Sequence, residues 1–405
     1  MSMKITVVGL GYIGLPTAAV LAVRKMQVLG VDINQKAVDT INRGEIHIVE
    51  PELDVLVRTA VSTGHLRAST KAEGAEVFIV AVPTPFKEGY EPDLSYIEAA
   101  SHSIAPVLKK GDLVILESTS PVGATEALAG WLYEQRPDLK VPVFNGKDDY
   151  DIFVAHCPER VLPGKVVHEI ISNDRIIGGV TPNCAEKAVK LYQSFVEGEC
   201  LVTDCRTAEM CKLVENSFRD VNIAFANELS MIADELSIDV WELIRLANRH
   251  PRVNILNPGP GVGGHCIAVD PWFIVSSAPN TANLIRTARN VNDAKPNYVF
   301  HQVCEKADAF KKPVIVCLGI AFKADIDDLR ESPALDISLK LAEQSIGRVL
   351  IVEPNIDELP KKFSGLDVEL VSLEKAFIEG NEFAVLVDHK QWFEPLAAPY
   401  PLAKW

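Results

Sequence analysis

The sequence predicts an α/β protein in which two doubly wound α/β domains are joined by a helical segment that contains a long helix. Short apolar strands alternate with helical stretches up to about residue 200. Helical periodicity with almost no helix-breaking residues then runs from about 206 to 249, and the alternation resumes at about residue 296. Strands that are apolar throughout and separated by helices are typical of a parallel sheet covered on both faces. We therefore expect domains at 1–203, 204–295 and 296–405.

Each strand is expected where a short apolar run lies between turn or helix signals. In the first domain these runs are Ile5–Val8, Val28–Val31, Val77–Ala81, Leu113–Glu117, Phe153–His156 and Arg175–Gly178, and in the last domain they are Val314–Leu318, Val349–Val352 and Ala384–Val387. The dense glycine and proline content of Pro258–Gly264 predicts a loop after the long helix.

Composition limits the partners and the compartment. The formal net charge of -15 over 405 residues repels nucleic acid and anionic membrane, although a local cluster of Arg and Lys can still bind a small anion. The sequence has no run of 18 apolar residues, so we expect no membrane insertion. Lys4–Val8 begins a strand with no signal-peptide pattern before it. The eight scattered cysteines form no C-x-x-C pair, so we expect no metal site and a reducing, cytoplasmic location.

A glycine pattern follows the first strand. Gly9-Leu10-Gly11-Tyr12-Ile13-Gly14 fits G-x-G-x-x-G between a strand and a helix. The first glycine permits a tight turn, the second lets the backbone approach a pyrophosphate, and the third lets the helix pack on the strand. The N-terminus of the helix then offers N–H groups to the phosphates. An ordinary strand–helix turn is the alternative, but Asp32 at the end of the second strand favours a Rossmann-type dinucleotide site.

Asp32 also bears on which dinucleotide binds. A carboxylate at this place can bind the ribose 2′-hydroxyl and would repel a 2′-phosphate, so we predict NAD rather than NADP. Val82-Pro83-Thr84-Pro85 ends a later strand, where open α/β sheets bind ligands. A rigid turn explains that segment equally well.

A cysteine beside a flexible loop is the candidate for chemistry. Gly261-Val262-Gly263-Gly264-His265-Cys266 puts three glycines just before the cysteine, which suggests backbone close to a ligand. Asp270 follows four residues later. A loop cysteine is usually inert packing, but the glycines and the nearby acid favour a nucleophile here.

The long helix carries polar residues where a buried helix should be apolar. Lys212, Asn216 and Arg219 fall at i, i+4 and i+7, on one face of the helix. A lysine and an amide on one face can hold an oxyanion. The alternative is a solvated stripe on an amphipathic helix.

Two further stretches contain side chains that bind anions. His250 and Arg252 precede the glycine loop, and Lys323 and Arg330 flank Asp325-Ile326-Asp327-Asp328. Either stretch could be ordinary surface charge, but together they suit a substrate with phosphates.

These features resemble one family, the nucleotide-sugar 6-dehydrogenases (the UDP-glucose/GDP-mannose dehydrogenase family). The resemblance runs from residue 3 to about 389. Its markers, in order, are Gly9–Gly14, Val82–Pro85, Glu117–Gly123, Cys157–Arg160, Lys212–Asn216, Gly263–Asp270 and Phe322–Pro333. Seven motifs in the family's order make the resemblance highly specific.

The resemblance implies a four-electron oxidation of a primary alcohol to a carboxylate with two NAD in sequence. Cys266 would capture the intermediate aldehyde as a thiohemiacetal, and water would hydrolyse the thioester formed by the second oxidation. Lys212 and Asn216 would stabilise oxyanions, and Asp270 would order or activate water. The implied catalytic residues are Cys266, Lys212, Asn216, Asp270, Glu159 and Thr119, the last two assisting with protons or water.

The resemblance also implies two sets of binding residues. The cofactor would be bound by Gly9, Gly11, Tyr12, Ile13, Gly14, Asp32, Thr84, Thr119, Thr125 and Arg330. The UDP-sugar substrate would be bound by Arg160, Val161, Lys212, Asn216, Arg219, His250, Arg252, Gly263, Lys323 and Arg330, some of them across a subunit boundary.

One stretch narrows the substrate within the family. Gly-Gly-His-Cys at Gly263–Cys266 replaces the Gly-Gly-Ser-Cys common in UDP-glucose enzymes. With Arg249–Ile255 and Arg160–Gly164, it resembles the branch that oxidises UDP-N-acetyl-D-mannosamine for bacterial surface polysaccharides such as enterobacterial common antigen. UDP-N-acetylglucosamine, UDP-glucose and GDP-mannose remain alternative substrates.

The resemblance extends to assembly and stops short of the C-terminus. The long helix, with Phe218, Phe225 and Met231, is the expected surface of a homodimer. Where the family usually has a last strand, Pro395–Trp405 is short and broken by prolines. We therefore expect an abbreviated edge of the last domain.

Two other classes of protein share part of this pattern. Dehydrogenases of the 3-hydroxyacid or 6-phosphogluconate type have the same N-terminal plan, but they use a lysine base, remove a single hydride and need no cysteine. A non-catalytic nucleotide-binding regulator would not require Cys266, Lys212 and Asp270 together. Two NADH per substrate would exclude the dehydrogenases that remove a single hydride.

Overall fold

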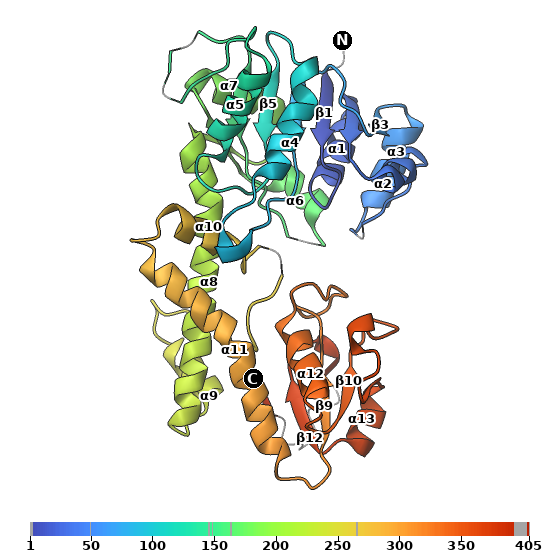
Figure 1. Cartoon of the computed structure of the whole chain (residues 1–405), viewed down its shortest axis with the longest axis vertical. Coiled ribbons are helices and arrows are strands. Elements are labelled where there is room, and N and C mark those ends of the chain that lie inside the picture. The colour runs from blue at the N-terminus through green and yellow to red at the C-terminus, as the bar shows by residue number, and fades with distance from the viewer. Residues whose placement is uncertain are drawn as a thin grey trace. The chain divides into compact units, whose positions relative to one another are not determined.

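The computed structural model describes residues 3–48, 50–144, 146–147, 149–162, 164–264, 266–392 and 403–404. The chain divides into two compact units, Met1–Glu215 and Asn216–Trp405, and the border lies inside the long helix α8 (Cys205–Glu235) (Figure 1). Each unit has its own sheet, and the three domain ranges drawn from the sequence stay a prediction.

The first unit is built on a sheet that has eight strands in the described part of the chain, in the order β3-β2-β1-β4-β5-β6-β7-β8. These are β1 (Lys4–Val8), β2 (Gln27–Val31), β3 (Leu66–Ser69), β4 (Val77–Val80), β5 (Leu113–Leu116), β6 (Phe153–His156), β7 (Arg175–Gly179) and β8 (Cys200–Asp204). The order of the first six is that of the Rossmann fold, with the switch point between β1 and β4. The predicted doubly wound fold is confirmed, with one correction: β7 runs antiparallel to β6.

Helices cover both faces of this sheet because alternate strand residues point to opposite faces. Ile79 packs in a core with α1, α6 and α7, whereas its neighbour Val80 packs in a second core with α4 and α5. The helices are α1 (Gly14–Val23), α2 (Gln35–Asn42), α3 (Leu53–Ser62), α4 (Ser95–Ile104), α5 (Ala124–Gln135), α6 (Val166–Ser172) and α7 (Pro182–Tyr192). Local signals start several of them. The Asn34 side chain caps α2, and Thr181 caps α7 with a proline next to it.

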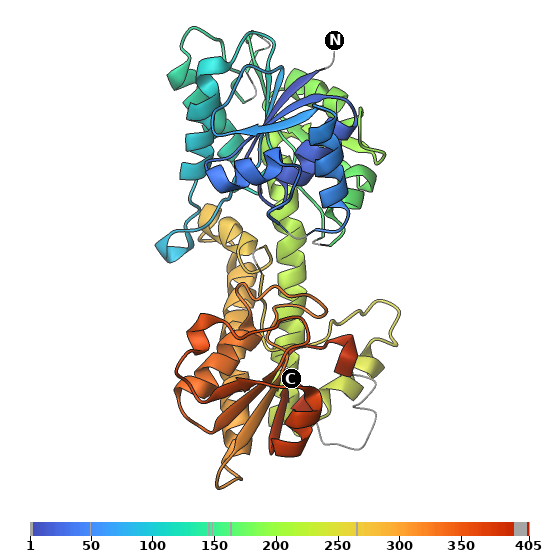
Figure 2. The same cartoon turned by 90° about the vertical axis from the view of Figure 1, so that its right-hand side faces the viewer.

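The second unit contains a smaller parallel sheet in the order β11-β10-β9-β12-β13. Its strands are β9 (Val314–Leu318), β10 (Arg348–Val352), β11 (Val368–Leu370), β12 (Glu382–Val385) and β13 (Ala403–Lys404), and its helices are α9 (Val240–Ala247), α10 (Asp270–Ser277), α11 (Asn283–Ala307), α12 (Pro333–Glu343) and α13 (Leu373–Glu379). Helices α11 and α12 pack on one face of the sheet and α13 packs on the other. Figure 2 shows these strands side by side, in orange to red. The order repeats β3-β2-β1-β4-β5 of the first unit.

Four strands were not predicted from the sequence, namely β3, β8, β11 and β13. The first three are short or half-exposed edge segments without the continuous apolar pattern of a buried strand. The helical stretch expected to about residue 249 is two helices, since α8 ends at Glu235 and α9 begins at Val240. Of the expected abbreviated edge at Pro395–Trp405, only the two residues of β13, paired with β12, are among those described.

Candidate active site

The turn after β1 has the shape that a dinucleotide requires. Gly9 has a φ of 91° and donates its N–H to the Val31 carbonyl at 2.8 Å. A Cβ at Gly9 would lie 2.4 Å from the Ala81 oxygen, and one at Gly14 would lie 1.8 Å from the Gly9 oxygen, so both positions need glycine. A Cβ at Gly11 would meet nothing within 4 Å. The backbone at Gly11 is therefore open to the close approach of a pyrophosphate.

Asp32 lies half-buried beside this turn, directly after β2. Its Oδ2 accepts the Leu10 N–H at 2.9 Å, and its Oδ1 accepts the Asn34 N–H at 2.8 Å. Each carboxylate oxygen has further lone pairs that can accept ribose hydroxyls. Tyr12 and Ile13 lie in the turn itself, before α1. The residues present in this cradle fit NAD.

Three predicted threonines follow β4 and β5, at the edge of the sheet where such folds bind ligands. Thr84 and Thr119 are half-buried, and the Thr84 hydroxyl has no hydrogen-bond partner among the described residues. Thr125 is fully buried, and its N–H and hydroxyl donate to Glu209 Oε1 at 2.7 and 2.5 Å. Since Glu209 occupies both donors of Thr125, contact of that residue with the cofactor stays a prediction.

Glu159 follows β6 and is surrounded by buried charge. Burial raises the pKa of its carboxyl to about 7, and the cations of Lys212 and Arg175 oppose this shift. Lys212 is buried on α8, and Arg175 is buried on β7 with Glu117 at 4.0 Å. A carboxyl with a pKa near 7 can give or take a proton at neutral pH. Sequence reasoning missed Arg175, because it treated this residue only as the start of a strand.

The neighbouring substrate candidates are Arg160 and Val161. The Arg160 guanidinium pairs with Glu215 at 2.7 Å and donates to the Asp174 carbonyl at 3.3 Å. Val161 is half-buried against the first core. Pro163, in the same motif, lies outside the described residues.

Cys266 is exposed and lies in the turn that precedes α10. Its carbonyl accepts the N–H of Val269 at 3.1 Å and of Asp270 at 2.9 Å. Asp270 is buried at the start of α10, and its Oδ2 accepts the Asn216 side-chain N–H at 2.5 Å. The structure thus gathers Cys266, Asp270 and Asn216 in the second unit. His265, before the cysteine, lies outside the described residues.

The glycine loop before Cys266 packs against the Phe322–Pro333 segment. A Cβ at Gly263 would lie 2.5 Å from the Glu331 oxygen, and one at Gly264 would lie 2.9 Å from the Phe322 ring. Gly264 also has a φ of 80°, which favours glycine. The close neighbour of these glycines is the protein itself, rather than the ligand suggested by the sequence.

A buried polar chain between α8 and α11 holds the same loop. The Gly259 N–H donates to Asn227 at 2.9 Å, and the Asn227 amide donates to Asn292 at 2.9 Å. Asn292 in turn donates to Asp220 at 2.8 Å, and Asp220 pairs with Arg289 at 2.5 Å. All four side chains are buried. Sequence reasoning missed them because polar residues inside a helix are usually assigned to a solvated face.

The remaining predicted anion binders lie exposed in the second unit; they are Arg219, His250, Arg252, Lys323 and Arg330. His250 Nδ1 accepts the Arg252 N–H at 3.3 Å, and Arg330 pairs with Asp328 at 2.6 Å. Within the described ranges, no group of three or more His, Cys, Asp or Glu side chains could hold a metal ion, and no helix is long and apolar enough to cross a membrane.

Comparison with known proteins identifies the family of the chain. Residues 3–196 match the NAD binding domain of the UDP-glucose/GDP-mannose dehydrogenase family, 206–294 match its central domain and 316–399 match its UDP binding domain. The chain belongs to the UDP-glucose/GDP-mannose dehydrogenase family. As a member with an NAD binding domain, it is an NAD-dependent dehydrogenase, and the UDP binding domain of the family contains Lys323 and Arg330.

Relatives within the UDP-glucose/GDP-mannose dehydrogenase family match nearly the whole chain. An "NDP-N-acetyl-D-galactosaminuronic acid dehydrogenase" from Ralstonia nicotianae is 66% identical, with 96% of this chain and 91% of the relative covered. A "UDP-N-acetyl-D-mannosamine dehydrogenase" from Campylobacter jejuni is 62% identical, with 96% of each covered. A solved structure of UDP-N-acetyl-mannosamine dehydrogenase from S. aureus is 43% identical, with a TM-score of 0.84 over 96% of this chain and 90% of that one.

Proposed function

We propose that this dehydrogenase oxidises the C6 alcohol of UDP-N-acetyl-D-mannosamine to the carboxylate, in a four-electron reaction that passes through a covalent adduct on Cys266. The observation that carries the covalent route is the position of Cys266, which is exposed and lies four residues before the buried Asp270 that begins α10. The choice of sugar is supported by the names of the relatives from C. jejuni and S. aureus. The product would serve the synthesis of a bacterial surface polysaccharide, such as enterobacterial common antigen.

The covalent route has two oxidations, and C6 loses a hydride and its hydroxyl group a proton in each of them. When bound, NAD accepts a hydride from C6 in each of the two oxidations. The Cys266 thiolate adds to the C6 aldehyde, so a C–S bond forms and the carbonyl oxygen takes a proton. After the second oxidation the adduct is a thioester. Water adds to it, the C–S bond breaks, and the carboxylate and the thiolate separate. The aldehyde is never released.

The other catalytic candidates have roles that suit their surroundings. Lys212 and Asn216, one turn apart on α8, would stabilise the oxyanions with an ammonium and an amide donor. Asp270 would order the water, since Asn216 fixes its carboxylate. Glu159, with a pKa near 7, would move a proton, and Thr119 would assist by positioning water.

The diphosphate needs cations, and we assign two exposed ones to it. Lys323 and Arg330 lie on the segment Ile320–Pro333, which also forms the support for the glycine loop before Cys266. The packing of this segment against the glycine loop would then link the residues that bind the diphosphate to the reacting cysteine. Arg160, Val161, Arg219, His250, Arg252 and Gly263 are the further substrate candidates.

The names of two other relatives favour a second sugar, UDP-N-acetyl-D-galactosamine. The relatives from Ralstonia, at 65–66% identity, are named for N-acetyl-D-galactosaminuronic acid. The two candidates differ in the configuration of hydroxyl and acetamido groups on the ring. Both carry the same C6 alcohol and the same diphosphate, so the mechanism above applies to either.

A product assay separates these candidates. The purified enzyme is given UDP-N-acetylmannosamine, UDP-N-acetylgalactosamine, UDP-N-acetylglucosamine or UDP-glucose with NAD, and NADH and uronate are measured. We expect the highest kcat/KM with UDP-N-acetylmannosamine, at two NADH for each uronate. Preference for UDP-N-acetylgalactosamine would transfer the assignment to the second sugar, and one NADH per substrate would refute the four-electron reaction.

A further inference from the structure

The second sheet repeats the glycine turn and the acidic residue of the cofactor site. Gly319 follows β9 as Gly9 follows β1, with a φ of 88° against 91°. Each glycine donates its N–H to the last residue of the neighbouring strand at 2.8 Å, Gly319 to Val352 and Gly9 to Val31. Glu353 then follows β10 as Asp32 follows β2. The two sheets therefore place a carboxylate at the same point of the same topology.

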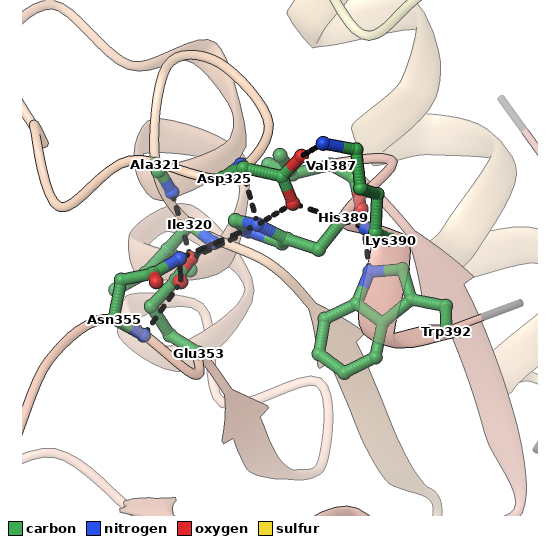
Figure 3. A network of polar contacts seen from close by, with 9 residues as sticks. All are labelled: Ile320, Ala321, Asp325, Glu353, Asn355, Val387, His389, Lys390 and Trp392. Carbon is green, nitrogen blue, oxygen red and sulfur yellow. Dashed lines mark hydrogen bonds and ion pairs between the residues drawn. The ribbon is translucent and has the colours of Figure 1, made fainter. Parts of the chain in front are cut away.

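The carboxylate of Glu353 is surrounded by hydrogen-bonding groups of the protein itself. Glu353 Oε2 accepts the N–H groups of Ile320 and Ala321 at 2.9 and 3.1 Å, and Oε1 accepts the Asn355 N–H at 3.2 Å. The donors that a phosphate would need at this turn are thus occupied by Glu353. His389 covers the carboxylate, with Nε2 at 3.1 Å from Oε2, and both side chains are buried (Figure 3).

His389 joins this carboxylate to the next part of the chain. Its Nδ1 accepts the Asp325 N–H at 2.9 Å, so Nε2 carries the ring proton and donates to Glu353. Trp392 fixes the orientation of the His389 ring. The two rings pack edge-on with 5.4 Å between their centroids, and the Trp392 Nε1–H donates a hydrogen bond to the Val387 carbonyl. The imidazole therefore uses its one donor and its one acceptor to link Glu353 to Asp325.

The residue held by this bridge has an unfavourable backbone. Asp325 has a φ of 61°, a left-handed conformation that a non-glycine residue adopts only when its surroundings fix it. Besides its N–H bond to His389, its carboxylate accepts the Lys390 N–H at 3.1 Å and pairs with Lys390 Nζ at 3.2 Å. Figure 3 shows Asp325 between these two neighbours. His389 and Lys390 therefore hold both the backbone and the side chain of Asp325.

We propose that His389 is a positioning residue for the sugar nucleotide, because it holds Asp325 and thereby shapes the Ile320–Pro333 segment that carries Lys323 and Arg330. This inference rests on the proposed contact of those two cations with the diphosphate. Asp325 lies between them in the chain. Loss of the bridge frees the Asp325 backbone to leave its left-handed conformation, and the two cations then lose their common geometry. The glycine turn and Asp32 of the cofactor site belong to the first unit, so of the two cations only Arg330 is also a cofactor candidate.

The test compares two kinds of replacement at His389. In His389→Phe the ring remains but the acceptor and the donor are gone. In His389→Gln an amide can again accept from Asp325 and donate to Glu353. Loss of one buried hydrogen bond corresponds to about a tenfold change in affinity. We expect His389→Phe to raise the KM for the UDP-sugar about tenfold and the KM for NAD by a smaller factor, because only Arg330 of the two cations is also a cofactor candidate. We expect His389→Gln to restore most of the affinity.

Three companion measurements make the test decisive. His301→Phe, on the exposed face of α11, is the matched control and should change neither KM. His389→Asn, too short to bridge both partners, replaces the phenylalanine variant if that variant fails to fold, and the same rise in KM is expected. Equilibrium dialysis with UDP alone should show the same loss of affinity without turnover.

The outcomes separate this inference from the proposed function. Lys323→Met should also raise the KM for the UDP-sugar. If Lys323→Met does so but the folded His389→Phe and His389→Asn variants keep the wild-type KM, the inference about His389 is wrong and the phosphate contact stands. If neither site affects that KM, both are wrong. An equal rise in the KM for NAD would also overturn the inference, since it would indicate general damage.

Discussion

Two carboxyl groups of the first unit differ in what their surroundings allow them to do. Asp32 is half-buried and accepts two backbone N–H groups, which fixes it as a hydrogen-bond acceptor beside the glycine turn. Glu159 is buried with an oxygen that has no hydrogen-bond partner among the described residues, and burial raises its pKa to about 7. The first suits binding, and the second suits proton transfer. Both positions were predicted from motifs, but the difference between them comes from packing.

Glu159 gives a pH prediction. Because burial raises the pKa of Glu159 from its usual range near 4.5 to about 7, the carboxyl is protonated over most of the pH range between those values. A step that needs the carboxylate should therefore slow as the pH falls below about 7. We expect Glu159→Gln to lower kcat and to remove this acid limb from the pH profile of kcat. Glu186→Gln, exposed on α7, is the control, and an unchanged acid limb in Glu159→Gln would contradict the assignment.

Asp32 gives a prediction about cofactor choice. Hydrogen bonds to a charged acceptor contribute about 1.5–3 kcal/mol, which is about a tenfold to hundredfold change in affinity. We expect Asp32→Ala to raise the KM for NAD by this factor and to narrow the gap to NADP. Asp39→Ala on the exposed side of α2 should change neither. Wild-type enzyme that used NADP as well as NAD would refute the role of Asp32.

At the scale of helices and strands, the sequence predicted what periodicity and turn residues determine. The strands of both sheets that lie in the interior appear where apolar runs placed them, and the glycine turn opens α1 as expected. The buried polar side chains could not be predicted in this way. Asp220, Arg289 and His389 are ordinary surface residues by composition, and only tertiary contacts reveal that they are buried. The break between α8 and α9 was also missed, since no glycine or proline marks it.

The ion pair between α8 and α11 gives a stability prediction. Burial raises the pKa of Asp220, and Arg289 opposes this shift at 2.5 Å. Removing one partner of a buried pair leaves an uncompensated charge and costs about 3–5 kcal/mol. We expect Arg289→Met to lower the free energy of unfolding by about this amount in urea denaturation, and Asp220→Asn added to it to recover part of the loss. Arg43→Met, in an exposed pair with Glu45, should have little effect. Equal losses from Arg289→Met and Arg43→Met would contradict the account.

At the scale of the whole molecule, α8 presents an apolar stripe to solvent. Phe218 and Phe225, seven residues apart, are 68% and 58% exposed, and Ile232 continues the row two turns later. Exposed apolar rows of this kind mark surfaces that bind another protein, and the predicted partner is a second copy of the chain. The repeated strand order of the two sheets is the other feature at this scale, whereas the sequence predicted only that both domains are doubly wound.

The stripe gives a prediction about assembly. We expect the wild-type protein to sediment as a homodimer at micromolar concentration and the double variant Phe218→Asp, Phe225→Asp to sediment as a monomer, because two carboxylates cannot be buried in an apolar contact without a large cost. Ile378→Asp, at a still more exposed apolar site on α13, should remain a dimer. A wild-type monomer, or a dimer in the double variant, would refute this surface.

The central claim is that Cys266 carries a covalent intermediate, and intact-protein mass spectrometry on two variants tests it most directly. Serine can still capture the aldehyde, but the resulting ester should hydrolyse more slowly than a thioester. With UDP-sugar and NAD, we expect Cys266→Ser to accumulate a sugar adduct, visible as a mass increase, and Cys266→Ala to show no adduct and to lose uronate formation. Cys304→Ala, on α11, is the matched control and should turn over normally. Uronate production by Cys266→Ala at near the wild-type rate, with two NADH per sugar, would contradict the covalent mechanism.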